Sequence, residues 1–186
     1  CCAPPLSPGC PAGYNAAGGS EVFFGSNITS IIRVLDVAIG KTGLGYREAK
    51  ACGHDAAYIE LHYNSHAGYY PGAQLMHCQA VYEKKTGRLL GMQAVGRDGI
   101  DKRIDIGSTA IKNRMHIHQL AGLDLSYQPA YGSARDAMNI LGMIGDNIRK
   151  DQLEFVDITD IKDKGLPESS ILLDVRSKKE FSAGSI

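Results

Sequence analysis

The chain has 186 residues, of which 44% are hydrophobic, and its 20 Lys and Arg residues balance 20 Asp and Glu residues at zero net charge. This length and composition suit a domain with a packed core, and the balanced charge provides no basic field of the kind that nucleic acids or anionic membranes attract. The longest apolar stretch, residues 28–39, is interrupted by Arg33 and Asp36, so the sequence predicts no membrane span, which needs about 20 apolar residues.

Residues 1–27 are rich in proline and glycine, and this composition predicts an irregular lead-in with little helix or strand. The segment starts with Cys1 and Cys2, without an initiator Met or a targeting pattern, which favours a numbering that begins inside a longer polypeptide. The five cysteines lack the paired spacing of a zinc site or a disulfide scaffold. We therefore expect a reducing compartment, the cytoplasm, and inert thiols at Cys52 and Cys78.

Strands and one short helix are expected next. Residues 31–39 alternate in polarity with one richly apolar face, which is typical of a strand. Residues 46–50 predict a short helix that ends near Gly53, and residues 57–63 predict a further strand. The side chains expected on one face of that further strand are Ile59, Leu61 and Tyr63.

The segments 74–83 and 89–95 predict a β-hairpin, because two alternating runs are separated by a short loop that contains Gly87. Strands joined in this way are antiparallel, which argues against the parallel sheet of a nucleotide-binding domain. The predicted class is α+β, an antiparallel sheet with helices on one side. The side chains expected to share a face are Met76, Cys78, Ala80 and Tyr82 on the first strand and Leu90, Met92 and Ala94 on the second.

Helices dominate the region that follows. Ile104, Ile111 and Met115 share helical spacing, and a short helix at residues 117–121 is expected to end at Gly122. The last helix of this region is expected to begin with a capping box formed by Ser133 and Asp136. Its apolar stripe and neighbouring glycines predict a surface for a second copy of the chain. The stripe is Ala137, Ile140, Leu141, Ile144 and Ile148, and the glycines are Gly132, Gly142 and Gly145.

Two loops rich in glycine and proline present paired phenols, SHAGYYPGA at residues 65–73 and YQPAYGSARD at residues 127–136. Together with IIRVLD, KTGL and IHQLAGLDLSY, they follow a recognisable order along the chain. This pattern resembles the carboxy-terminal dimerisation domain of flavin-dependent pyridine nucleotide-disulfide oxidoreductases, in particular the coenzyme A disulfide reductase and persulfide reductase branch. The resemblance implies a dimerisation domain at residues 28–150, preceded by a remnant of a flavin-binding domain at 1–27.

The resemblance also implies roles for the tyrosines. Active sites in this family form at the dimer interface, so Tyr127 and Tyr69 are the candidate catalytic residues, reaching the partner's flavin and redox cysteine. Tyr70 remains the alternative to Tyr69. A phenol with a pKa near roughly 10 is protonated at neutral pH and can donate a proton to a departing thiolate. The simpler interpretation is that these tyrosines only fill an interface. Weaker substrate-binding candidates are His66, Tyr70 and Tyr131.

The cofactors implied for the complete enzyme are FAD and NAD(P)H, with coenzyme A as substrate or bound ligand. Its expected partners are a second subunit, in a homodimer, and a small thiol, disulfide or persulfide. No cofactor site is expected in this chain, because Gly40, Gly43 and Gly45 run in the wrong order for the dinucleotide fingerprint. No metal site is expected either, because His116 and His118 lack a third ligand. The chain alone is therefore expected to be inactive and colourless.

Residues 151–186 are expected to be a linker followed by the start of a second domain, with the boundary near residues 149–155. The run ILLDVRSKKEF at 171–181 resembles the opening strand and helix of a rhodanese domain, whose persulfide-forming cysteine would lie after Ile186. This resemblance favours sulfur over oxygen as the substrate. The alternatives are an NADH oxidase or peroxidase of the same family and a non-catalytic oligomerisation module.

Overall fold

A computed structural model of the chain describes residues 9–23, 25–153, 161, 162, 165, 169–171 and 173–184. The chain divides into two compact units, Cys1–Leu153 and Glu154–Ile186. In the part that the structure describes, no helix combines the length and the apolar character needed to cross a bilayer.

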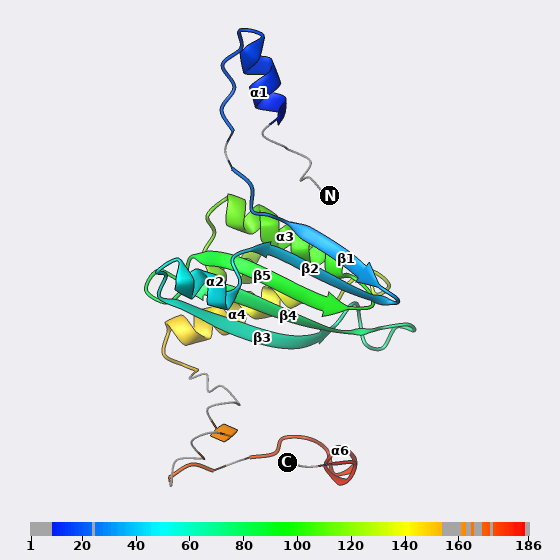
Figure 1. Cartoon of the computed structure of the whole chain (residues 1–186). Helices are drawn as coiled ribbons and strands as arrows, with labels where there is room; N and C mark the ends of the chain where they lie inside the picture. Colours follow the sequence, from blue (N-terminus) through cyan, green and yellow to red (C-terminus); the bar gives the residue numbers. More distant parts are fainter. Residues whose placement is uncertain are drawn as a thin grey trace. The chain divides into compact units, whose positions relative to one another are not determined.

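The first unit is built on a five-stranded antiparallel sheet with the strand order β1-β2-β5-β4-β3 (Figure 1). This architecture confirms the predicted α+β class, and the hairpin expected at residues 74–95 is present as β4 and β5. The strands are β1 (Ser30–Val34), β2 (Val37–Gly43), β3 (Ala56–Asn64), β4 (Leu75–Glu83) and β5 (Leu89–Gly96).

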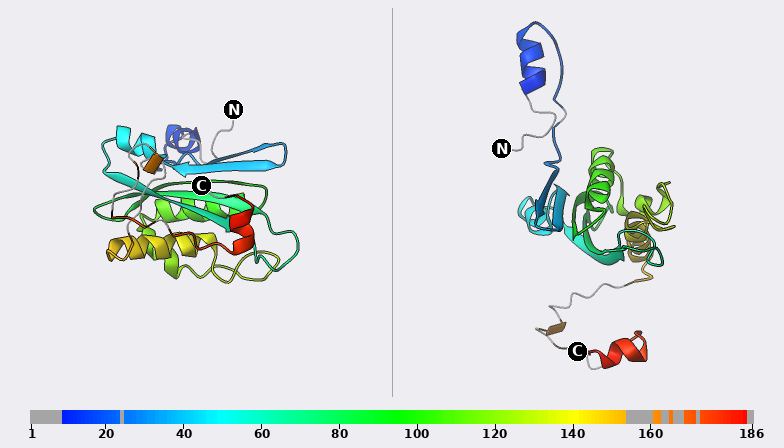
Figure 2. Two further views of the ribbon diagram at one scale, coloured as in Figure 1. Left: turned by 90° about the horizontal axis from the view of Figure 1, so that it is seen from below. Right: turned by 90° about the vertical axis from the view of Figure 1, so that its right-hand side faces the viewer.

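The longer helices cover one face of the sheet, and Figure 2 shows α3 and α4 together on that side. The short helix α2 lies against the opposite face near one end of the strands (Figure 2). The helices of the first unit are α1 (Gly9–Ala16), α2 (Tyr46–Ala51), α3 (Ile100–Lys112), the 3₁₀ helix η1 (Ile117–Gly122) and α4 (Ala137–Arg149).

The main core lies between the sheet and the longer helices. The predicted inward side chains of β4 are buried there, and Met92 and Ala94 of β5 join them. Leu90 is an exception, because a β-bulge between Val81 and Tyr82 shifts the register and turns Leu90 into a small second core beneath α2. The residues of this second core are Ala49, Ala56, Val81 and Leu90.

The prediction of a single strand at residues 31–39 is wrong. The structure has a tight hairpin, with β1 and β2 pairing from Val34↔Val37 outward around a turn at Leu35 and Asp36. Neither turn residue is glycine or proline, so the sequence carries no strong turn signal there. Leu35 adopts a left-handed backbone with φ 56°, a conformation that a leucine side chain disfavours. The expected apolar face is also exposed along the whole of β1.

The lead-in at residues 1–27 is not irregular throughout, because α1 occupies part of it. At the end of this lead-in, the side-chain amide of Asn27 donates to the backbone carbonyl of Ser108 on α3 at 2.8 Å. The backbone carbonyl of Asn27 accepts a hydrogen bond from Gly43 N at 2.8 Å. The chain is therefore attached to the sheet domain from about Asn27 onward. The expectations for Cys1 and Cys2 lie outside the described residues.

The start of α4 also differs from the prediction. Asp136, not Ser133, is the N-cap: its carboxylate accepts from Met138 N, and Asn139 reaches back to Asp136 N at 3.0 Å. An aspartate is as good an N-cap as a serine, so the motif was placed three residues too early.

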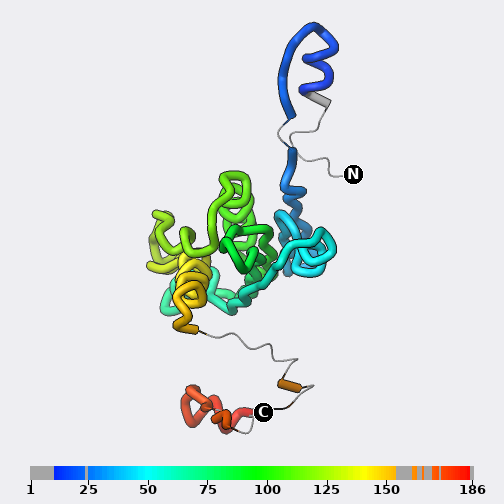
Figure 3. Tube along the Cα trace, turned by 90° about the vertical axis from the view of Figure 1, so that its left-hand side faces the viewer, coloured from blue at the N-terminus to red at the C-terminus, as the bar shows by residue number. Residues whose placement is uncertain are grey.

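The apolar stripe of α4 packs in part within the same chain, and its use as a surface for a second copy stays a prediction. Ala137 and Leu141 belong to the core, and Ile144 and Ile148 pack against it. Gly142 and Gly145 allow η1 of the same chain to approach closely. A Cβ on Gly142 would lie 2.6 Å from the carbonyl carbon of Leu120. Figure 3 shows α4 running beside this yellow-green segment.

In the second unit, helix α6 (Lys178–Ser182) is present and begins with a capping box between Ser177 and Glu180. The strand expected before it is not formed, because residues 171 and 173–175 have no regular structure. A strand needs a hydrogen-bonding neighbour, and the described residues of this unit provide none. The rhodanese resemblance therefore stays a prediction.

Candidate functional site

The two phenol-bearing loops lie side by side at one end of the sheet. The first tyrosine loop, residues 65–74, connects β3 to β4, and the second tyrosine loop, residues 127–136, leads into α4. Ala67 N of the first loop donates to the Gly132 carbonyl of the second at 3.1 Å. Tyr63 at the end of β3 adds a hydrogen bond from its hydroxyl to the Arg135 carbonyl at 2.9 Å. Segments about sixty residues apart are thus joined through their backbones.

This contact brings the two main candidates together. The hydroxyl oxygens of Tyr69 and Tyr127 are 3.1 Å apart and form a hydrogen bond. Both side chains remain accessible, with exposed fractions of 77% for Tyr69 and 49% for Tyr127. The hydrogen bond to Tyr127 raises the pKa of Tyr69 above its ordinary value. The pair therefore places two hydroxyl groups, each able to donate a hydrogen bond, at an exposed position.

The weaker candidates occupy different positions. Tyr70 packs edge-on against His66, with ring centroids 5.8 Å apart, so it is not part of the phenol pair. His66 is buried, with 6% of its surface exposed, and its Nδ1 lies 3.2 Å from the Ala67 carbonyl. Tyr131 is 75% exposed on the second tyrosine loop. The geometry thus favours Tyr69 over Tyr70 as the partner of Tyr127.

A buried ion pair that sequence reasoning missed lies beneath both loops. Arg103 of α3 binds the Asp136 carboxylate with two nitrogens, Nε to Oδ1 at 3.2 Å and Nη2 to Oδ2 at 2.7 Å. Both side chains are almost completely buried. The only signal in the sequence was an arginine within the apolar pattern of a predicted helix, which shows no partner until the chain is folded.

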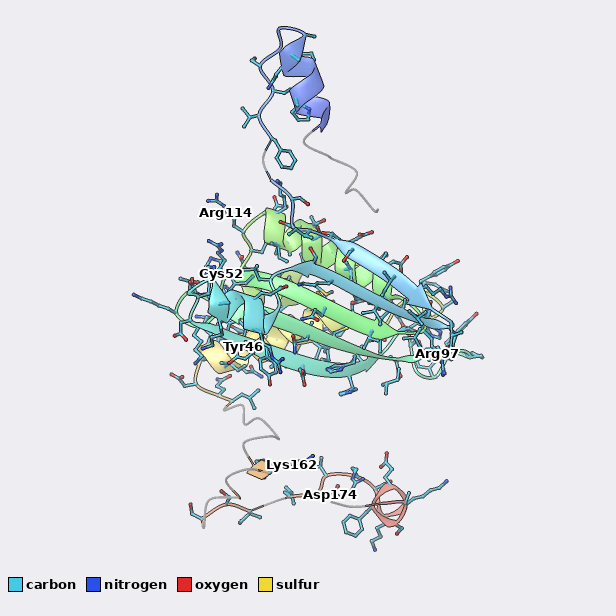
Figure 4. The ribbon with its side chains drawn as sticks, in the orientation of Figure 1. Tyr46, Cys52, Arg97, Arg114, Lys162 and Asp174 are labelled. Carbon is cyan, nitrogen blue, oxygen red and sulfur yellow. The ribbon has the colours of Figure 1, made fainter. Side chains whose placement is uncertain are left out.

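Cys52 and Cys78 lie in opposite environments. Cys78 is buried on β4, and burial raises the pKa of its thiol to about 12. Cys52 is exposed at the end of α2 (Figure 4). A thiol held protonated is a poor nucleophile, which agrees with the expectation that Cys78 is inert.

The glycines at positions 40, 43 and 45 serve packing. Gly40 lies beneath Ile104 of α3, and Gly43 has φ 67° with its Cα close to β5, where a Cβ would lie 2.9 Å from Gly91 Cα. Gly45 precedes α2, and its N–H donates to the Glu48 carboxylate at 2.6 Å. Since these glycines are occupied by strand and helix contacts, the residues around them do not fit a phosphate-binding loop for FAD or NAD(P)H.

Residues 29–138 match the family model of the pyridine nucleotide-disulphide oxidoreductase dimerisation domain. The chain belongs to this family. The matched range contains the whole sheet, α3 and both tyrosine loops.

Relatives of this dimerisation domain have named activities. The coenzyme A disulfide reductase of Staphylococcus epidermidis is 32% identical over 127 residues, which cover 68% of this chain and 28% of that protein. The crystal structure of reduced Bacillus anthracis CoADR-RHD matches with a TM-score of 0.85 and 34% identity, over 94% of this chain and 31% of that chain. The chain therefore spans less than a third of these relatives.

Two further solved structures share the fold. An NAD-dependent persulfide reductase from A. fulgidus matches with a TM-score of 0.75 and 33% identity, over 89% of this chain and 31% of that one. A water-forming NADH oxidase from Lactobacillus brevis matches with a TM-score of 0.68 and 22% identity, over 73% and 30% respectively, and this similarity concerns the fold alone.

Proposed function

We propose that this chain is the interface domain of a flavin-dependent NAD(P)H:disulfide or persulfide oxidoreductase that acts on coenzyme A disulfide or persulfide. In this proposal the domain forms a homodimer and supplies Tyr127 and Tyr69 to the partner subunit's active site. The sulfur substrate follows the named activities of the relatives that are 32–34% identical.

The observation that carries the proposal is the hydrogen-bonded phenol pair. Two tyrosines from separate loops meet through their hydroxyls at 3.1 Å while remaining exposed. The hydrogen bond between the two phenols fixes where both hydroxyls lie, which packing of their rings alone would not require. An exposed pair on one side of a dimerisation domain suits a role towards a second subunit.

The chemistry that these residues can perform is proton transfer. When a thiolate leaves a disulfide or a persulfide, it needs a proton. Tyr127 can donate its phenolic proton to the sulfur, so that an O–H bond breaks and an S–H bond forms, while Tyr69 donates its own hydrogen bond to the resulting phenolate. FAD and NAD(P)H would supply the electrons, and they would be bound by parts of the enzyme other than the described residues of this chain.

The test is steady-state kinetics of Tyr127→Phe, Tyr69→Phe and the double variant in the complete enzyme. Phenylalanine keeps the ring and removes only the hydroxyl, so dimerisation and flavin content are expected to stay unchanged. Loss of a general acid typically lowers turnover by roughly 10²–10⁴-fold. The double variant is expected to lose less than the product of the two single effects, because the hydroxyls act as a unit.

Tyr14→Phe provides a matched control, because Tyr14 is an exposed tyrosine of α1 that lies outside both tyrosine loops. Its turnover is expected to be unchanged, and the rate of flavin reduction by NADH is expected to be the same in all variants. Wild-type turnover in Tyr127→Phe would return the pair to the role of interface aromatics.

A further inference from the structure

Arg103 has the unusual combination of full burial and contacts to three separate backbone segments. Only 1% of its side chain is exposed. An arginine is charged at any physiological pH, and burying a charge is strongly unfavourable unless it is paired and hydrogen-bonded. The groups that Arg103 binds are therefore the segments whose positions depend on this buried charge.

The guanidinium connects the first tyrosine loop to the second. Its Nη2 donates to the Ser65 carbonyl, where the first loop begins, at 2.8 Å, and also to Asp136 Oδ2, where the second loop ends. Its Nη1 donates to the Gly99 carbonyl before α3 at 3.1 Å. Ser65 in turn closes the first loop, because its N–H donates to the Gln74 carbonyl at 2.8 Å.

Asp136, the last residue of the second tyrosine loop, is also held by several contacts. Its carboxylate caps α4 through Met138 N and also lies 3.5 Å from Lys102 Nζ. One end of each tyrosine loop is thus attached to the same planar cation. Between the two loops themselves, whose residues are all described, the only backbone–backbone hydrogen bond is the one that Ala67 N donates to the Gly132 carbonyl.

We propose that Arg103, acting through Asp136 and the Ser65 carbonyl, is a positioning residue that sets the distance between the Tyr69 and Tyr127 hydroxyls. A lysine could not replace it, because an ammonium lacks the planar fork that binds both carboxylate oxygens and a carbonyl together. The importance of this distance for catalysis rests on the proposed function, whereas the positioning itself can be tested on the present chain.

The readout is the titration of Tyr69, followed by NMR of the chain with ring-labelled tyrosine and assigned with Tyr69→Phe. In the parent chain the hydrogen bond to Tyr127 raises the pKa of Tyr69. Tyr127→Phe removes that bond and gives the reference value for an isolated Tyr69. If Arg103 positions the pair, Arg103→Lys is expected to lower the pKa of Tyr69 to this reference.

Two further variants separate positioning from general stability. Arg103→Met combined with Asp136→Asn removes both charges together, which buried pairs tolerate better than the loss of one partner, and it keeps an N-cap side chain on α4. It is expected to lower the pKa of Tyr69 like Arg103→Lys. The control is Thr42→Val, which removes a buried hydroxyl bonded to Thr29 on the β2 side of the domain, and it is expected to destabilise the fold without shifting Tyr69.

Circular dichroism establishes that each variant is folded before titration. If Tyr69 in the folded double variant titrates as in the parent chain, the loops hold the phenols without the ion pair and the proposal is wrong. An equal shift in Thr42→Val would also overturn it, because the shift would then reflect stability alone. Because no turnover is measured, failure here leaves the test of the proposed function untouched.

Discussion

The buried thiol of Cys78 shows how position alone sets the chemistry of a residue. It lies on β4 within the main core, where burial removes the water that would solvate a thiolate. Burial raises its pKa from 9.0 to about 12. Tyr82, also on β4, is buried in the same core, and burial raises its pKa as well. Because burial disfavours the charged forms, ionisation of either group lowers the stability of the folded chain.

This arrangement predicts a loss of stability in alkali. The folded pKa of Cys78 lies above the unfolded value, so the unfolded chain releases the proton first, and stability falls as the pH rises from about 9 to about 12. Cys78→Ala is expected to make this decline shallower, although it lowers stability at neutral pH by creating a cavity. Urea unfolding across this pH range measures the slope. Cys52→Ala, which changes an exposed thiol, is expected to keep the parent slope, and an unchanged slope in Cys78→Ala would contradict the argument.

At the scale of elements, the packing of α4 on η1 determines how the second tyrosine loop enters the domain. Gly142 and Gly145 present a surface without side chains, and η1 lies directly against it. Asn139 adds hydrogen bonds from its Nδ2 to the carbonyls of Leu120 and Leu123 at 3.1 and 3.0 Å. The glycines that suggested contact with another molecule thus serve contact between two neighbouring helices.

Gly142→Ala is expected to destabilise the chain by about 1–3 kcal/mol, the usual cost of overpacking. Its Cβ would meet the backbone of Leu120 and Ala121, which cannot rotate away as a flexible side chain can. Gly122→Ala is the matched control, because a Cβ there meets no atom within 4 Å. Urea unfolding of both variants measures the difference. Equal stabilities would show that η1 shifts freely and that the close approach is unimportant.

At the scale of the whole molecule, the chain consists of one sheet domain and a separate unit that begins at Glu154. Among the residues that the structure describes, every member of the two hydrophobic cores lies at or before position 148. The described part of the second unit adds a short helix whose capping contacts are local. The described hydrophobic contacts that stabilise the sheet domain therefore all lie within the first unit.

A chain that ends at Leu153 is expected to unfold at the same temperature as the full chain, because the truncation removes none of the described core residues. Thermal unfolding followed by far-ultraviolet circular dichroism compares the two. A chain that ends instead at Asp136 loses α4 and serves as the control, and it is expected not to fold cooperatively. A clear drop in the midpoint of the Leu153 chain would show that the second unit supports the first.

Elements whose pattern is local could be predicted from the sequence. Alternation on β4 and the loop at Gly87 predicted the hairpin and its inward side chains, since both depend on residues adjacent in the chain. The family match, not spacing, selected Tyr69 and Tyr127. The local pattern was insufficient at Leu35, a leucine in a left-handed turn position, and at Leu90, the extra residue of a bulge in β5.

Which distant groups meet depends on how the whole chain folds. The hydrogen bond between Tyr69 and Tyr127 and the ion pair between Arg103 and Asp136 each join residues from separate elements. No local periodicity encodes such pairs, because their geometry depends on how α3, α4 and the sheet pack together. For the same reason the stripe of α4 was recognised as apolar from its sequence, whereas the surface that covers it, η1 and the core of the same chain, was visible only once the chain was folded.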